Sequence, residues 1–290
     1  VFRGIQNTMW IMKASIAGAL VNVVLDYVLV FGIGDFKPNM GIEGVAWASV
    51  FSQVTMLVVI TVIVKRKTIF SLLPKFKKVN HEFGNMLRMS ANMLIRTIAL
   101  NTAFFFANRY ATSYGENYLA AHTILINLWV FSFFFIDGFS NAGNAISGKL
   151  LGQKDFKSLT FLIKDLIKYN LIVSLFLALV FVALYPVIGR IFSNNEEVTG
   201  YFYSVYWLII IAQFISGITF TYDGVFKGLG ETVFLRNTLI LATGLVFLPI
   251  IYGLDLMGFK LYAIWIAFLV WNAFRGGSLI YKFRKKYRTV

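Results

Sequence analysis

Asn22 and Asp26 are the residues whose types and spacing best suit chemistry, because they interrupt an almost wholly apolar stretch, residues 9–33. Residues i and i+4 share one face of an α-helix, so the amide and the carboxylate point the same way. An acid inside a segment of hydrocarbon length must face a partner, a cavity or an ion. This face is therefore a candidate binding site, and the alternative is a structural acid satisfied by a donor on a neighbouring helix.

Arg96 and Asp137 are a second pair of charges within apolar segments. Arg96 stands eight residues beyond Arg88, or about 12 Å along a helix, and Asp137 stands twelve residues before Lys149, or about 18 Å. These depths predict an ion pair between Arg96 and Asp137, which would act either as a fixed staple or as a gate.

The other polar residues give no sign of catalysis or of metal binding. Asp223 is four residues from Lys227 and is expected to reach the membrane interface. His81 and His122 each lack a second ligand at metal spacing. We find neither a nucleophile–base pair nor a metal cluster, so the sequence predicts no enzyme and no cofactor.

The composition places these residues in a membrane protein. Hydrophobic residues make up 58% of the 290 residues and charged residues only 14%, with a mean hydropathy of +0.73. The apolar runs predict an all-α, polytopic protein of about eight transmembrane helices. They lie near residues 9–33, 43–65, 84–112, 118–148, 158–187, 198–226, 233–254 and 259–281.

The net charge of +14 follows the same plan. Basic residues gather in alternate loops, chiefly at 65–78, 149–157 and 282–288, and each opposite loop holds a single cation. This positive-inside bias predicts a multi-pass protein of the cytoplasmic membrane with both ends of the chain in the cytoplasm. Because the bias accounts for the charge, nucleic acid is not an expected partner.

A short repeat suggests how the helices are grouped. The segment FRGIQNT at residues 2–8 resembles FKGLGET at residues 226–232, and each precedes a long apolar helix. About four helices precede the second copy, so symmetry leads us to expect four helices upstream of the first copy. The expected parts are a partial N-terminal lobe at 1–66, an amphipathic cytoplasmic linker at 67–83 and a C-terminal lobe at 84–290.

Several motifs resemble the multidrug and toxic compound extrusion (MATE) family. FRGIQNT at 2–8, LVNVVLD at 20–26 and GIEGVAWAS at 41–49 resemble the family's fifth and sixth helices. Three further stretches resemble its DinF-like branch, namely 119–122, 129–139 and 148–152. The resemblance implies two six-helix lobes, of which this chain holds the last two helices of the first and all six of the second.

The resemblance also implies roles for individual residues. Asn22 and Asp26 match the Asn and Asp of the family's cation site, and Ser49 stands where a sixth-helix Thr contributes. The first-helix Asp of that site lies outside this sequence, and the seventh-helix Glu of some members has no match between Asn85 and Asn101.

The function implied is antiport. An inward flow of Na⁺ or H⁺ would drive export of organic, cationic or amphipathic compounds through the lipid bilayer. The alternative is a flippase for lipid-linked saccharides, which shares the two-lobe plan and would line its cavity with cationic side chains for phosphate.

Overall fold

The computed structural model describes residues 9–33, 38, 40–67 and 83–287. Contacts divide the chain into an N-terminal unit, Val1–Asn80, and a C-terminal unit, His81–Val290, which we describe separately. The expected linker at 67–83 lies outside the described residues except for its two end positions.

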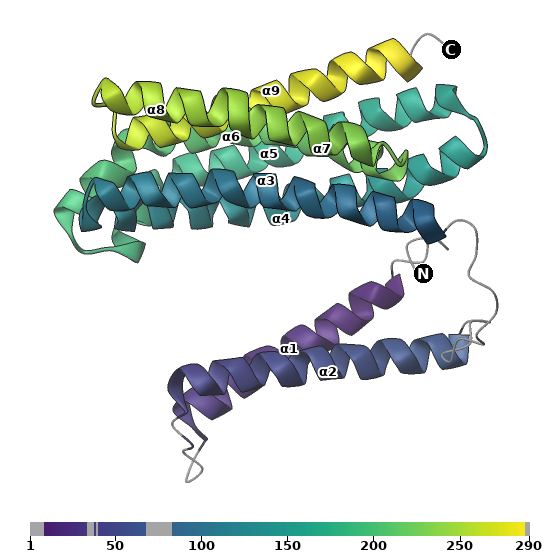
Figure 1. The fold of residues 1–290 in the computed structure, drawn as a ribbon. Coiled ribbons are helices and arrows are strands. Elements are labelled where there is room, and N and C mark those ends of the chain that lie inside the picture. Colours follow the sequence, from purple (N-terminus) through teal and green to yellow (C-terminus); the bar gives the residue numbers. More distant parts are fainter. Residues whose placement is uncertain (1–8, 34–37, 39, 68–82, 288–290) are drawn as a thin grey trace. The chain divides into compact units, whose positions relative to one another are not determined.

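The N-terminal unit is a hairpin of two helices, α1 (Met9–Phe31) and α2 (Gly41–Lys67) (Figure 1). Small residues at four-residue spacing form its interface, because they let two backbones approach closely. The Ser52 hydroxyl donates to the Gly18 carbonyl over 2.8 Å across this interface. The buried positions are Ala14 and Gly18 on α1, and Gly44, Ala48 and Ser52 on α2.

The C-terminal unit is a helical bundle in which α6 (Glu196–Gly228) is the central element. It packs against α4 (Glu116–Gly152), α5 (Phe156–Phe192) and α9 (Leu261–Tyr287). The remaining span packs against α3 (Phe83–Ser113) and α9. It comprises α7 (Thr232–Leu241), the π-helical segment η1 (Ala242–Phe247) and α8 (Leu248–Leu256).

The core of this bundle is rich in aromatic rings. Trp129 on α4 and Trp265 on α9 are fully buried, with ring centroids 5.6 Å apart, and Phe268 packs on both. Large rings bury much apolar area and hold specific edge-to-face geometries, so they fix the spacing of α4 and α9.

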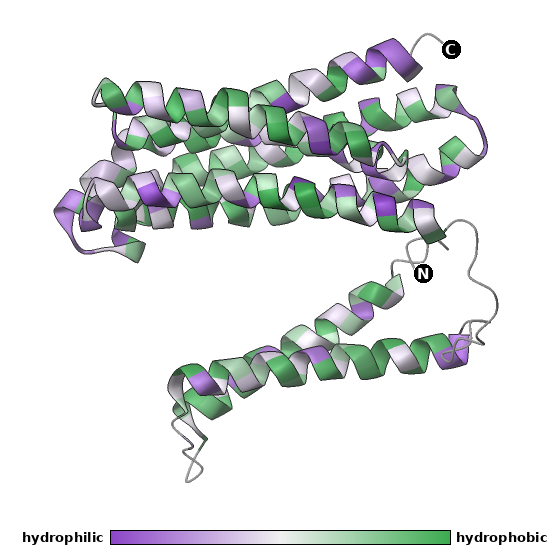
Figure 2. Ribbon diagram, in the orientation of Figure 1, coloured by the Kyte–Doolittle hydropathy of each residue, from purple (hydrophilic) through white to green (hydrophobic). Residues whose placement is uncertain are grey.

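The described helices form a multi-pass membrane protein. Seven of the described spans are long and apolar enough to cross a bilayer, counting α7, η1 and α8 as one. Helix α3 has 31 residues but a more polar sequence, which includes Arg88, Asn92 and Arg96. Hydrophobic residues cover most of each helix, and hydrophilic ones are more frequent toward the helix ends (Figure 2).

Candidate functional site

Asn22 and Asp26 extend the row of α1 that contacts α2. They follow Ala14 and Gly18 at successive four-residue steps, and both are half-buried. The Asp26 Oδ1 atom is buried and has no hydrogen-bond partner within the described residues. A buried acceptor of this kind is costly, so it favours a bound cation, a proton or a donor from elsewhere.

Ser49 is not joined to this pair by any hydrogen bond that the structure describes. It lies one residue after the buried Ala48 and is exposed, so its hydroxyl is turned away from the centre of the α1–α2 interface. Its predicted role as a cation ligand therefore stays a prediction.

The strongest electrostatic feature of the C-terminal unit is Asp223 on α6. Its side chain is only 4% exposed and contacts three cations. One terminal nitrogen of Arg96 donates to both carboxylate oxygens, over 2.7 and 2.8 Å. Lys227 Nζ lies 2.7 Å from Oδ2, and Arg275 Nη2 lies 3.7 Å from Oδ1. The cluster thus joins α3, α6 and α9 through one carboxylate.

The predicted ion pair between Arg96 and Asp137 is wrong. Asp137 is exposed on α4 and accepts a 2.8 Å hydrogen bond from Asn141, one turn further along the same helix. Spacing along the sequence predicted how deep Asp137 lies along its helix, but not from which side of the helix its side chain projects. Asp137 lies one residue, or about 100° around α4, from the buried Ile136. Asp223 is paired with Lys227, as its four-residue spacing allows, but it is buried and also contacts two arginines.

A second polar network joins α3 to the start of α7. Arg236 donates to Asn92 Oδ1 over 2.7 Å, and the Asn92 amide donates to the Thr232 hydroxyl over 3.2 Å. In the loop between α6 and α7, burial would raise the pKa of Glu231, but hydrogen bonds from Lys286 and Tyr287 outweigh it and hold that pKa below its usual value. Glu231 is therefore ionised and compensates Lys286.

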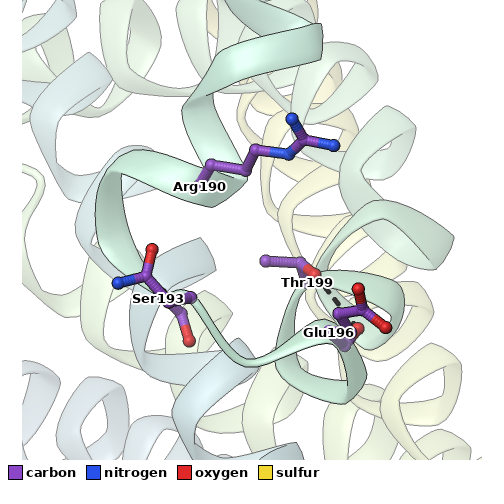
Figure 3. A pocket seen from close by; sticks show the side chains of 5 residues that line it. Arg190, Ser193, Glu196 and Thr199 are labelled. Carbon is purple, nitrogen blue, oxygen red and sulfur yellow. Dashed lines mark hydrogen bonds between the residues drawn. The ribbon is translucent and has the colours of Figure 1, made fainter.

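A hollow at the turn between α5 and α6 is explained by local structure. It has a volume of about 360 Å³, and Arg190, Ser193, Glu196 and Thr199 face it (Figure 3). The Thr199 hydroxyl donates to the Glu196 carbonyl over 3.0 Å, and the neighbouring Asn195 caps the first turn of α6. These bonds stabilise a helix start and assign no ligand.

Sequence reasoning missed Arg275 and did not identify Arg96 as a partner of Asp223. Arg275 is 3% exposed and stacks on the Trp271 ring, with 4.6 Å between the guanidinium carbon and the ring centroid. A sequence signal was available, because Arg275 interrupts an apolar helix just as Arg96 does.

Comparison with known proteins identifies the family. The MatE family model matches residues 93–252, which is more than half of the chain. The chain belongs to the MatE family. This family match confirms the resemblance drawn from the motifs. It covers α4, α5 and α6 completely, and thus the helix that carries Asp223.

Relatives of this MatE chain are found in plants and bacteria. Protein DETOXIFICATION 43 of Arabidopsis thaliana is 28% identical over 95% of this chain and 50% of its own length. DNA damage-inducible protein F of Escherichia coli (strain K12) is 23% identical over 94% of this chain and 58% of its own length. The chain spans about half the length of the curated relatives it matches.

Solved structures share the fold. A MATE transporter of Vibrio cholerae has a TM-score of 0.85 at 18% identity, covering 100% of this chain and 65% of the other. A MOP superfamily transporter of Pyrococcus furiosus has a TM-score of 0.84 at 21% identity, covering 96% and 62%. These likenesses confirm the all-α polytopic fold class of the MatE chain.

Proposed function

We propose that this chain is part of a cation-coupled exporter, which uses an inward Na⁺ or H⁺ gradient to expel organic compounds across the cytoplasmic membrane. The proposal rests on the MatE match together with one observation, the buried Oδ1 of Asp26, which has no hydrogen-bond partner among the described residues. A carboxylate oxygen at membrane depth without a protein donor is suited to a transient cation or proton.

The charge distribution favours the N-terminal unit as the place of coupling. Both oxygens of Asp223 are already contacted by built-in cations, so this carboxylate has no free side for a mobile one. Asp26 has no such partner among the described residues. Coupling through Asp26, with Asn22 as a neutral neighbour on the same face, is therefore the simpler assignment.

The remaining parts of the proposal follow from family and charge. Both ends of the chain lie in the cytoplasm, as the bias of basic residues predicts. The partners are the lipid bilayer and an organic, cationic or amphipathic substrate. The names DETOXIFICATION and multidrug resistance protein NorM, carried by relatives, support export of foreign compounds.

The alternative function is a flippase for lipid-linked saccharides, and one observation favours it. Such a protein needs cations to hold phosphate, and Arg96, Lys227 and Arg275 converge in the C-terminal unit. Their convergence on a carboxylate weakens this alternative, because Asp223 neutralises part of their charge.

Reconstitution of the full-length protein tests the proposal. We expect proteoliposomes to expel a fluorescent organic cation when an inward Na⁺ or H⁺ gradient is imposed, and to stop when an ionophore collapses that gradient. The proposal would be contradicted if export were independent of both the Na⁺ and the H⁺ gradient. It would also be contradicted if the protein moved a fluorescent lipid-linked saccharide between the two leaflets and exported no organic cation.

A further inference from the structure

The buried cluster around Asp223 carries more positive than negative charge. Arg96, Lys227 and Arg275 contribute three cations, and Asp223 is the one carboxylate within 4.0 Å of them in the described part of the chain. Arg96 and Arg275 have side chains only 11% and 3% exposed. Uncompensated charge in such a setting is strongly unfavourable, so the cluster calls for a further anion.

Hydrogen bonding gives an independent sign of the same need. Arg96 Nε and Arg275 Nη2 are both buried, and neither has an acceptor within hydrogen-bonding distance among the described residues. A guanidinium presents five donors and no acceptor, and carboxylate or phosphate oxygens are the groups that match its geometry. The cluster therefore offers donors beyond those that Asp223 uses.

A pocket lies beside this cluster, at the end of the C-terminal unit where α6 ends and α7 begins. It has a volume of about 440 Å³. Lys227 belongs to both features, since its ammonium contacts Asp223 and its side chain lines the pocket. Among the described residues, the lining contains no carboxylate and comprises Met89, Ser90, Met93, Asn144, Lys227 and Thr232.

The pocket's polar lining suits an oxyanion. Ser90, Asn144 and Thr232 provide hydroxyl and amide donors, and Lys227 provides a charged one. Arg236 is connected to Thr232 through Asn92, which adds positive charge nearby. Glu231 directly precedes Thr232, but its carboxylate is hydrogen-bonded by Lys286 and Tyr287, so it does not neutralise the positive charge of Lys227 or Arg236.

We infer that this pocket binds a phosphate group, with Lys227 as its principal charged contact and with Ser90, Asn144 and Thr232 as neutral donors. Free phosphate carries between one and two negative charges near neutral pH, and a phosphodiester headgroup carries about one. Either would offset part of the cluster's excess through Lys227, the cation of the cluster that lines the pocket. The pocket is lined by other residues than Asn22 and Asp26, and the inference does not depend on the proposed transport function. The group could belong to free phosphate or to a phospholipid headgroup.

Thermal unfolding of the purified full-length protein in detergent tests the site, with inorganic phosphate as the probe and chloride at equal ionic strength as the reference. We expect phosphate to raise the midpoint of unfolding with a saturable dependence. Lys227→Gln and Asn144→Asp should each weaken phosphate binding at least about tenfold, through loss of a charged hydrogen bond or gain of a like charge. Lys227→Arg should retain binding.

Lys164→Gln is the matched control, because Lys164 is an exposed cation on α5 outside the pocket. Size-exclusion chromatography selects folded variants, and Asn144→Asp keeps the test decisive if Lys227→Gln does not fold.

Titration in nanodiscs of phosphatidylcholine, with and without phosphatidylglycerol, identifies the source of the phosphate group. If phosphatidylglycerol weakens the binding of inorganic phosphate, the ligand of the pocket is a phospholipid headgroup. If the affinity for phosphate is the same in both kinds of nanodisc, the ligand is the free ion.

Two results would overturn the inference. One is the absence of saturable binding of both phosphate and phosphatidylglycerol to the wild-type protein. The other is equal affinity in wild type, Lys227→Gln and Asn144→Asp, because the protein would then bind anions without this pocket. Since the readout is binding, failure here leaves the export assay unaffected.

Discussion

At the scale of single residues, Asp223 and Asp26 are opposites. Asp223 is surrounded by Arg96, Lys227 and Arg275, whereas the buried oxygen of Asp26 has no described partner. A carboxylate fixed by three cations is suited to hold helices together, and one without a partner is suited to take up an ion and release it. An aspartate thus has a structural role in the C-terminal unit and, in our proposal, a role in ion coupling in the N-terminal unit.

A double-mutant cycle tests the ion pair of Arg96 with Asp223. Asp223→Asn should lower the unfolding free energy by about 3–5 kcal/mol, because it leaves three cations without their carboxylate. Arg96→Gln should cost less, since Lys227 and Arg275 remain. The double variant should be less destabilised than the sum of the two, as measured by reversible unfolding in mixed micelles.

In the control cycle, Asp137 is mutated instead of Asp223. Arg96→Gln and Asp137→Asn should be additive, because Asp137 is exposed on α4 and bonded to Asn141. Coupling in this control cycle, or strict additivity in the first, would contradict the pairing that the structure describes.

These residues show what the sequence could and could not predict. The shared face of Asn22 and Asp26 follows from four-residue spacing alone. The partner of Arg96 did not follow, because axial rise gives depth in the membrane but not which neighbouring helix a side chain faces. Only the packing of α3, α6 and α9 places Arg96 against Asp223.

At the scale of helices, close approach depends on small residues. Helix α4 contacts α6 at Ser140 and Gly224, where an added Cβ on Gly224 would overlap the Ser140 carbonyl oxygen.

The positions of the helices were predictable from the apolar runs, and seven described spans have the length and composition of a membrane helix. The π-helical segment within 232–256 was not predicted, because hydropathy does not distinguish π from α hydrogen bonding.

Gly224→Ala and Gly138→Ala form a matched test of this packing. The first should destabilise the protein by about 1–3 kcal/mol, since a backbone atom must move to admit the methyl group. The second should be neutral or stabilising by up to about 1 kcal/mol, because a Cβ on Gly138 meets nothing within 4 Å and Ala favours the helix. Thermal melts of both variants measure the difference, and equal midpoints would contradict close α4–α6 packing.

At the scale of the whole molecule, charge should set the orientation. Residues 1–290 contain no cysteine, so a single cysteine introduced here can be labelled without background from this part of the protein. Gln153 follows α4 and Asn194 follows α5, and both are exposed. We expect an impermeant maleimide to label Asn194→Cys in intact cells and Gln153→Cys only after lysis. The reverse pattern would show that both ends of the chain face outward.

The central claim is that Asp26 couples a cation gradient to export, and the direct measurement compares Asp26→Asn with wild type in full-length proteoliposomes. Asn keeps the shape of the side chain but removes the charge, so the variant should assemble and bind substrate normally. Its gradient-driven efflux should fall to the leak of empty liposomes, while Asn22→Ala should lose less, because it removes a neutral group. Asp165→Asn, an exposed acid on α5, should retain wild-type efflux and serves as the control. Wild-type efflux from well-folded Asp26→Asn would contradict the account.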